Sequence, residues 1–366
     1  MYRHDNRIVI TLDAGGTNFV FGAMRGCEYI TTPITYPSNA QDLDLCLKTM
    51  VKGFREVIDS LDESPVAISF AFPGPADYAN GIIGGYLPNF PSFRDGVALG
   101  PFLKNEFGLP VFINNDGDLF AFGEALCGAL PEINKKLEAA GSNKRFKNLI
   151  GYTFGTGFGI GIVVNNHLNG GDNSCVETFC LPHKLKNGII VEEGVAVRAI
   201  KRVYAEASGD YNHNYEPKDI CEIADGKRPG DVNAAKKAFA EFGQIAGDAM
   251  AIAAQLIDGL IVIGGGITAA RHLILPSLLE EMRSSLSTIP GESVKRVQME
   301  VFNLDDPKQF EIFAKGNRKN IPVYGTNLTV EYDDMKRIGV TFSKLGASKA
   351  ISAGAYAFAL SKIDEI

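Results

Sequence analysis

Three short stretches of the chain are rich in glycine, and two of them also contain a threonine. They are Gly15, Gly16 and Thr17; Gly155, Thr156 and Gly157; and Gly264, Gly265 and Gly266. Each stretch follows a run of apolar, strand-like residues. Because glycine has no Cβ, the backbone N–H groups of such turns can approach an anion closely. We therefore expect these turns to hold the phosphate groups of a nucleotide.

An acid stands just before the first of these turns. Asp13 cannot hold phosphate itself, because like charges repel, but it fits a site in which Mg²⁺ lies between the carboxylate and the phosphates. The alternative for this turn alone is a tight hairpin with a surface acid. None of the three stretches has the lysine-containing P-loop pattern or the GxGxxG spacing of dinucleotide-binding folds.

A second acid follows a strand-like run in FINNDGDLFAFGE, residues 112–124. The strand would deliver Asn115 and Asp116 to its carboxyl end, where Asp116 could accept the proton of a substrate hydroxyl and Asn115 could hydrogen-bond to a polyol. The alternative is that Asp116 only caps the following helix. We expect Asp118 and Glu124 to lie on a solvated first turn and helix face.

The elements that must position these residues follow an α/β rhythm. Strands are expected at 8–12, 19–24, 28–32, 66–72, 110–114 and within 148–166, and helices from Ser38 to Leu61, at 116–129, before GLIVIGGGIT and at the C-terminus. The expected first helix starts with a capping-box pattern, Ser38 and Gln41. The strand, glycine turn, strand unit near residue 13 recurs near residue 155. This weak duplication predicts two α/β lobes with a cleft between them.

We place the N-terminal lobe at residues 1–117, completed by a C-terminal helix at 349–366, and assign it the polyol and phosphate side. The C-terminal lobe, on the nucleotide side, would comprise 118–348 and include an extra segment at about 290–346. This segment would be a surface elaboration or a dimer contact.

Composition excludes several classes of partner. The 366 residues carry a formal net charge of -7 without a long Lys/Arg cluster, so we expect no nucleic-acid partner. No apolar run approaches the roughly 18 residues that a membrane helix needs. The six cysteines are scattered without a disulfide-framework spacing, which favours reduced thiols and a cytoplasmic location.

The motifs DAGGTN, PGPAD with LPNF, NND, GTGFG and VIGGGIT occur in the order typical of ROK sugar kinases (repressors, open reading frames and kinases), which the chain resembles over most of its length. The resemblance implies a two-lobed actin-like ATPase (ribonuclease H-like) fold with an interlobe cleft. It also implies ATP and Mg²⁺ as cofactors, with Mg²⁺ near Asp13 and Asp116. Asp116 would be the general base that activates a hexose or N-acylhexosamine hydroxyl, the 6-OH, for attack on the γ-phosphorus. Asn89 and Asn115 would bind sugar hydroxyls.

The chain departs from this family where a Glu-x-Gly-His stretch and a cysteine-rich zinc loop normally stand. Glu177 matches the sugar-binding glutamate, but Cys180 replaces the histidine. Glu192 or Glu193 matches the glutamate that follows the loop, and we prefer Glu193. Cys175, Cys180 and His183 have spacings compatible with zinc ligation, but a fourth ligand is missing, so we expect no zinc.

These departures keep open the alternative of a sugar-binding regulator or pseudokinase without turnover. An actin-like nucleotide hydrolase or assembly protein is less consistent with LPNF and NND, which indicate a polyol pocket. We expect a small-molecule sugar and a nucleotide as partners, with a homodimer as a candidate assembly.

Overall fold

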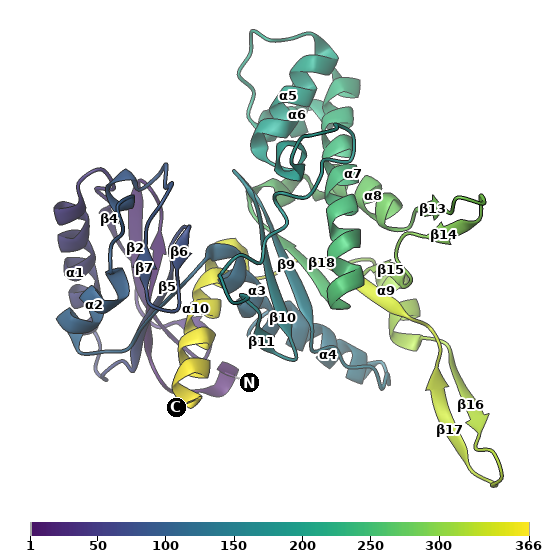
Figure 1. Ribbon diagram of the computed structural model, residues 1–366, viewed down its shortest axis with the longest axis horizontal. Helices are drawn as coiled ribbons and strands as arrows, with labels where there is room; N and C mark the ends of the chain where they lie inside the picture. Colours follow the sequence, from purple (N-terminus) through teal and green to yellow (C-terminus); the bar gives the residue numbers. More distant parts are fainter. Residues whose placement is uncertain (1, 366) are drawn as a thin grey trace. The chain divides into compact units, whose positions relative to one another are not determined.

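The computed structural model describes residues 2–365, which form two compact units (Figure 1). Unit 1 comprises the chain up to Pro131, Ile160–Val176 and the chain from Ser343 onward, and unit 2 comprises Glu132–Gly159 and Glu177–Phe342. The expected boundary at 117/118 lies inside a helix of unit 1. Whether these compact units coincide with the functional lobes stays a prediction.

Unit 1 is built on a six-stranded sheet of order β3-β2-β1-β5-β8, with β4 paired to β2. The strands are β1 (Val9–Ala14), β2 (Asn18–Arg25), β3 (Glu28–Tyr29), β4 (Ile34–Pro37), β5 (Ala67–Ala71) and β8 (Val111–Asn114). β1 pairs antiparallel with β2 and parallel with β5, which in turn is parallel to β8. The carboxyl ends of β1, β5 and β8 therefore meet at one edge of the sheet.

Helices cover both faces of this sheet. The main core packs α1 (Leu43–Asp59) and α2 (Leu99–Phe107) against one face, whereas α10 (Ala347–Asp364) and α3 (Asp116–Leu126) pack together, with α10 lying along β1, β5 and β8. The expected Ser38 capping box at α1 is wrong, because Asp42 is the N-cap and accepts from the N–H of Leu45. The remaining small elements are η1 (Tyr2–His4), β6 (Ala76–Asp77), β7 (Ile82–Ile83) and η2 (Pro91–Phe93).

A second six-stranded sheet has the order β11-β10-β9-β12-β18-β15. Its strands are β9 (Leu149–Phe154), β10 (Phe158–Val164), β11 (His167–Leu168), β12 (Leu260–Gly264), β15 (Glu300–Asn303) and β18 (Arg337–Phe342). β9, β12, β18 and β15 run parallel to one another. The second and third glycine stretches thus follow adjacent parallel strands of unit 2.

The helices of unit 2 gather around its longest one, α7 (Val232–Ile257), which packs against α5, α6 and α8. The others are α4 (Ala129–Ala139), η3 (Val191–Gly194), α5 (Val197–Ser208), α6 (Pro217–Ala224), η4 (Gly266–Ala270), α8 (Arg271–Met282) and α9 (Pro307–Lys315), the first of which starts in unit 1. Gly243 and Gly247 allow α7 to approach α8 closely, because a Cβ at either position would lie within 2.5 Å of an α8 carbonyl oxygen.

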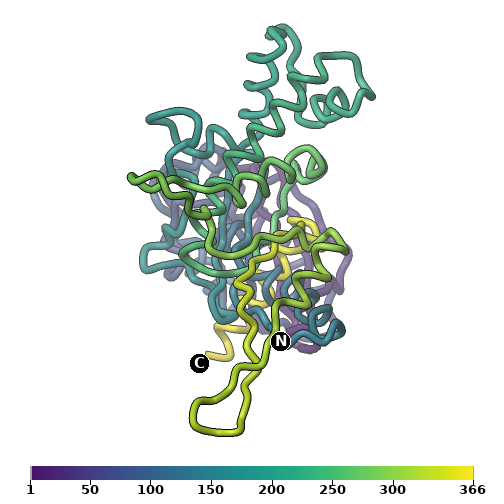
Figure 2. The backbone as a smooth tube through the Cα atoms, turned by 90° about the vertical axis from the view of Figure 1, so that its right-hand side faces the viewer, coloured from purple at the N-terminus to yellow at the C-terminus, as the bar shows by residue number. Residues whose placement is uncertain are grey.

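The extra segment at about 290–346, together with the residues just before it, forms two β-hairpins around β15, α9 and β18. β13 (Ser285–Ser287) pairs with β14 (Ser293–Lys295), and β16 (Arg318–Pro322) with β17 (Thr329–Asp333). The β16–β17 hairpin extends away from the body of unit 2 in both views (Figures 1 and 2), and nearly all its strand residues are exposed. β18, by contrast, is entirely buried and belongs to the sheet rather than to the surface.

A disulfide joins Cys27 and Cys127, which corrects the expectation that all thiols are reduced. Cys27 follows β2, and Cys127 is the C-cap of α3, where Arg3 also donates hydrogen bonds to its carbonyl. Because the two cysteines are separated by 100 residues, only the packed unit brings them together. The cytoplasmic location stays a prediction.

None of the helices formed by residues 2–365 combines the length and apolar character needed to cross a bilayer.

Candidate functional site

The first glycine turn joins β1 to β2 and presents backbone donors. It is closed by the N–H of Gly15, which donates to the carbonyl of Asn18 at 3.0 Å. On its other side, the Ser38 N–H donates to the Thr17 carbonyl and the Ser38 hydroxyl donates to the Gly16 carbonyl. Because the N–H and C=O of a trans peptide point in opposite directions, the N–H of Thr17 points away from Ser38. Gly16 and Thr17 are exposed, so an anion can reach this donor.

Asn89 lies directly beside the first turn. A Cβ built on Gly16 would lie only 3.0 Å from the Asn89 Cβ. Asn89 itself is exposed, but the neighbouring Phe90 is buried and stacks on Phe19 of β2. The buried Phe90 therefore holds Asn89, the predicted sugar ligand, next to the first glycine turn.

Strand register brings Asp13 to the same sheet edge as the second acid. Asp13 lies opposite Ala71 of β5, and Ala71 lies opposite Asn114 of β8. Neighbouring strands are about 4.8 Å apart, so Asp13 and the residues after Asn114 share one edge. Burial raises the pKa of Asp13, and a hydrogen bond with Ser348 at the start of α10 opposes that rise.

Asn115, and not Asp116, is the N-cap of α3. The Asn115 Oδ1 accepts from the N–H of Asp118 at 2.6 Å, so this oxygen has a structural role. Asp116 is the first helical residue, and its Oδ1 accepts from the N–H of Gly117 at 2.9 Å. Asn115 therefore supplies the helix cap, so capping does not explain the presence of Asp116.

The carboxyl group of Asp116 is accessible to solvent, yet enough protein surrounds it to reduce its hydration. This loss of hydration raises the pKa of Asp116. Hydrogen bonds from the backbone oppose the rise, and the negative charge of Asp13 adds to it. A carboxylate with a raised pKa is a stronger proton acceptor, as general-base chemistry requires.

The expectation that Asp118 and Glu124 are solvated is wrong. Their side chains belong to the buried face of α3, with exposed fractions of 5% and 0%. Burial, followed by the charge of Asp116, raises the pKa of Asp118 to about 7. Glu124 accepts from the N–H of Ala129 and from the Ser343 hydroxyl, so it joins α3 to the start of α4 and to the segment before α10.

The second glycine turn, between β9 and β10, repeats the arrangement of the first. Its carbonyls are engaged from the α5 side, where the N–H of Val197 donates to Gly155 and Arg198 donates to Thr156. By the same peptide geometry, the N–H groups of Thr156 and Gly157 point away from α5. Thr156 is exposed, so these donors can meet an anion.

Of the two glutamates after the missing zinc loop, Glu192 touches the second turn. Its Oε2 accepts from the N–H of Phe158 at 3.0 Å and would lie 3.0 Å from a Cβ at Gly157. Glu193 pairs with Arg198, which lowers the pKa of Glu193. Glu192 is thus the glutamate that contacts the second glycine turn. The preference for Glu193 as the sugar ligand stays a prediction. Nothing in the spacing of the sequence distinguishes the two glutamates.

The third stretch ends β12 and lies against the second. Gly265 has φ +95°, and a Cβ there would meet the Phe154 carbonyl oxygen at 2.2 Å, so only glycine fits. A Cβ on Gly266 would meet open space. β12 and β9 are parallel, with Gly264 opposite Thr153, so both stretches lie at the carboxyl edge of one sheet. The expected strand, turn, helix order is confirmed, with η4 inserted before α8.

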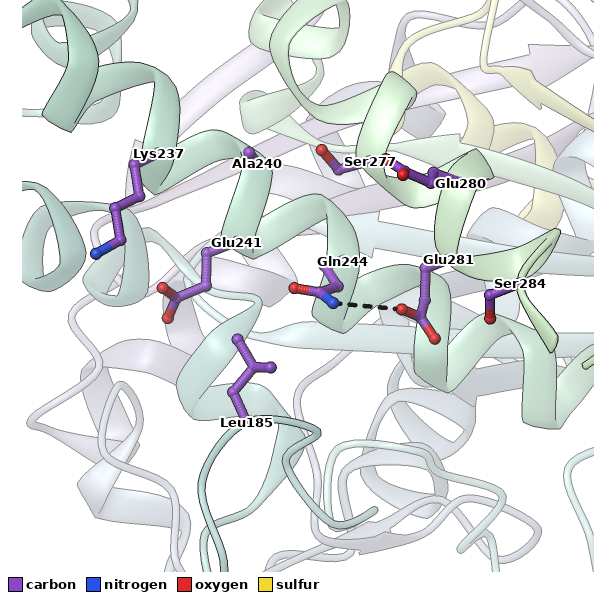
Figure 3. Close-up of a pocket in the computed structure, with 9 residues that line it drawn as sticks. All are labelled: Leu185, Lys237, Ala240, Glu241, Gln244, Ser277, Glu280, Glu281 and Ser284. Atoms are coloured by element: carbon purple, nitrogen blue, oxygen red, sulfur yellow. Dashed lines mark hydrogen bonds between the residues drawn. The ribbon is translucent and has the colours of Figure 1, made fainter. Parts of the chain in front are cut away.

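The segment that stands in place of the zinc loop is anchored by ion pairs. Lys184 Nζ lies 2.6 Å from Glu281 of α8 and 3.3 Å from Asp248 of α7. Arg296 reaches the same Asp248 carboxylate at 2.7 Å. Figure 3 shows the adjoining cavity of about 440 Å³, with Leu185 beneath α7 and α8. A charged cluster therefore fixes this segment.

The three residues considered for zinc are divided between the units. Cys175 belongs to unit 1, whereas Cys180 and His183 belong to unit 2. The imidazole of His183 is buried and its Nδ1 accepts from the N–H of Leu185, and burial lowers the pKa of His183. Glu177, the other predicted sugar ligand of this segment, is exposed in unit 2. Within residues 2–365, the metal-binding side chains that converge are instead Cys221, Asp225 and His272.

Unit 1 thus collects Asp13, the first turn, Asn89, Asn115 and Asp116, and unit 2 collects the other two turns with Glu192. The donor set fits nucleotide and Mg²⁺: two carboxylates provide the oxygen ligands that Mg²⁺ prefers, and the turns provide N–H donors for phosphate.

The chain is similar along its length to known proteins. The ROK family model matches residues 9–306. A glucokinase of known structure from Parabacteroides distasonis is 56% identical, with a TM-score of 0.89 and 99% of each chain covered. The glucokinase of Thermotoga maritima is 25% identical over 304 residues, 75% of this chain and 86% of the relative. A ROK family glucokinase from Streptomyces griseus, solved with glucose and AMPPNP, is 19% identical with a TM-score of 0.60 and covers 96% of this chain and 98% of its own; it shows the fold alone.

The strand order, the glycine turns and these neighbours define an actin-like ATPase fold of the sugar-kinase type. The chain belongs to the ROK family, whose model spans most of it. Its full-length similarity to a glucokinase indicates that it is an enzyme, a sugar kinase of the phosphotransferase class.

Proposed function

We propose that this protein transfers the γ-phosphoryl group of ATP to the 6-OH of a hexose or N-acylhexosamine, with Asp116 as the general base. The observation that carries the proposal is the start of α3, where Asn115 supplies the helix cap and leaves an accessible Asp116 carboxylate at the edge shared with Asp13. Full-length similarity to a glucokinase supports a hexose as the acceptor.

In this proposal, Asp116 accepts the proton of the attacking hydroxyl, and its raised pKa favours that transfer. Asn89, Asn115, Glu177 and Glu193 are the proposed sugar ligands, with Glu192 as the alternative to Glu193. The N–H donors of the glycine turns bind the phosphate oxygens and hold the γ-phosphorus in line with the hydroxyl. Mg²⁺ near Asp13 and Asp116 would neutralise phosphate charge when bound.

The alternative is a sugar-binding regulator or pseudokinase. The observation that favours it is the replacement of the zinc loop by a segment fixed through Lys184. Neither the glycine turns nor Asp116 is altered by this replacement, so we favour the kinase.

The test compares the wild type with Asp116→Asn across a panel of hexoses and N-acylhexosamines, following ADP release with ATP and Mg²⁺. Asparagine keeps the Oδ1 that accepts from Gly117, so the start of α3 is preserved while the proton acceptor is lost. We expect sugar-dependent ADP release to fall on the order of 100-fold or more. Asp62→Asn, the same change at an exposed carboxylate outside α3, is the control and should keep its rate.

An unchanged rate in Asp116→Asn would remove this residue from the mechanism. Sugar binding by calorimetry without ADP release from the wild type would favour the regulator. A homodimer is also proposed, on the family resemblance alone, and multi-angle light scattering will measure it.

A further inference from the structure

Three side chains with metal-binding atoms converge in unit 2, and none of them belongs to the three glycine stretches. They are Cys221, Asp225 and His272, whose sulfur, carboxylate oxygen and imidazole nitrogen all lie within 4.8 Å of one another. The Asp225 Oδ1 and the His272 Nε2 are 2.8 Å apart. Thiolate, carboxylate and imidazole are the three kinds of side-chain ligand that Zn²⁺ takes in proteins.

The local structure holds these residues in place. Cys221 lies in α6 and Asp225 is the C-cap of that helix, so their i, i+4 spacing puts both on one face. His272 is the second residue of α8, and α6 packs against η4, the turn that leads into α8. The start of α6 is fixed by a capping box between Glu216 and Asp219. Both elements belong to the same compact unit.

The distances suit a small tetrahedral ion. Zn²⁺ binds nitrogen and oxygen at about 2.0–2.1 Å and sulfur at about 2.3 Å, which separates its ligand atoms by roughly 3.2–3.8 Å. The observed separations, 2.8 Å between Asp225 Oδ1 and His272 Nε2 and at most 4.8 Å within the set, bracket that range. The second Asp225 oxygen pairs with Lys227 at 2.9 Å, which orients the carboxylate as outer partners do in metal sites.

We propose that Cys221, Asp225 and His272 bind Zn²⁺, with a fourth position open to water. The mixed sulfur, nitrogen and oxygen donors favour zinc over Mg²⁺ or Ca²⁺, which prefer oxygen alone. A bound ion joins α6 to the start of α8, a few residues after Gly266. The site shares no residue with the set Cys175, Cys180 and His183, and it does not rest on the proposed function.

The experiment uses the full-length protein, stripped with a chelator, incubated with Zn²⁺ alone and dialysed. Retained zinc is measured by plasma mass spectrometry for the wild type, Cys221→Ser, His272→Ala and the control Cys180→Ser, whose thiol is exposed. We expect the wild type and the control to retain one zinc per chain. Cys221→Ser and His272→Ala should retain at least about tenfold less zinc, because each has lost a ligand.

Cobalt substitution gives a second, spectroscopic readout of the same site. Co²⁺ bound to the wild type should show a thiolate-to-metal charge-transfer band, and Cys221→Ser should lose that band while Cys180→Ser keeps it. A wild type that retains no zinc and shows no such band would overturn the proposal, because Asp225, Lys227 and His272 would then form only surface ion pairs. Retention that depends on Cys180 instead of Cys221 would overturn it as well.

Discussion

Asp118 should make the protein less stable as the pH rises through the neutral range. Its carboxyl group is 5% exposed, and its pKa rises from 3.8 to about 7 because of burial and the charge of Asp116. The folded state therefore binds a proton that the unfolded state has already released between these two pH values. In that window the unfolded state holds fewer protons, so the free energy of unfolding falls as the pH rises.

The magnitude follows from the two pKa values. At about 1.4 kcal/mol for each pH unit, the rise from 3.8 to about 7 corresponds to roughly 4 kcal/mol, absent below pH ~4 and complete above pH ~7. Asp118→Asn cannot ionise and keeps the side-chain size. We expect its free energy of unfolding, relative to the wild type, to increase by up to this amount across the same window.

The assay is urea unfolding of both proteins at a series of pH values from about 4.5 to about 8. Asp62→Asn, which removes an exposed carboxylate of the same unit, is the matched control and should follow the wild type. If Asp118→Asn and the wild type lose or gain stability in parallel over the whole range, the carboxyl group is not held protonated by burial and this reasoning is wrong.

Three further outcomes are expected. Gly265→Ala should destabilise the protein by about 2 kcal/mol or more, because its backbone is left-handed and a carbonyl fills the Cβ position, whereas Gly266→Ala, which faces open space, should be close to neutral in thermal unfolding. Reduction of the bond between Cys27 and Cys127, which closes a loop of 100 residues, should lower the free energy of unfolding by roughly 2–5 kcal/mol in urea, and equal stability with and without reductant would contradict the disulfide. Lys184→Met removes one of the cations that pair with Asp248 of α7 and Glu281 of α8, so hydrogen exchange in the segment after residue 184 should become faster. Unchanged exchange would show that these ion pairs do not anchor the segment.

The sequence by itself determined the local features of this protein. Apolar runs of period two and the helical spacing of Leu43 to Leu61 predicted the strands and α1, because these patterns depend only on neighbouring residues. Glycine stretches after strands predicted the turns, and their order resembled the ROK family, which the comparisons confirm. The placement of Asp116 at the end of β8 was also predicted.

Tertiary structure alone decided what the same residue types do. Asn115 and Asp116 are both good caps, and the geometry of the turn gave that role to Asn115. Asp118 resembles a solvated acid until α3 packs against β10 and the segment after β11, where Gly161 and Gly170 lie beside it. The bond between Cys27 and Cys127 and the ion pairs of Lys184 join segments far apart in the chain. Burial and long-range pairing depend on which distant elements pack together. The spacing of residues along the chain does not specify that packing.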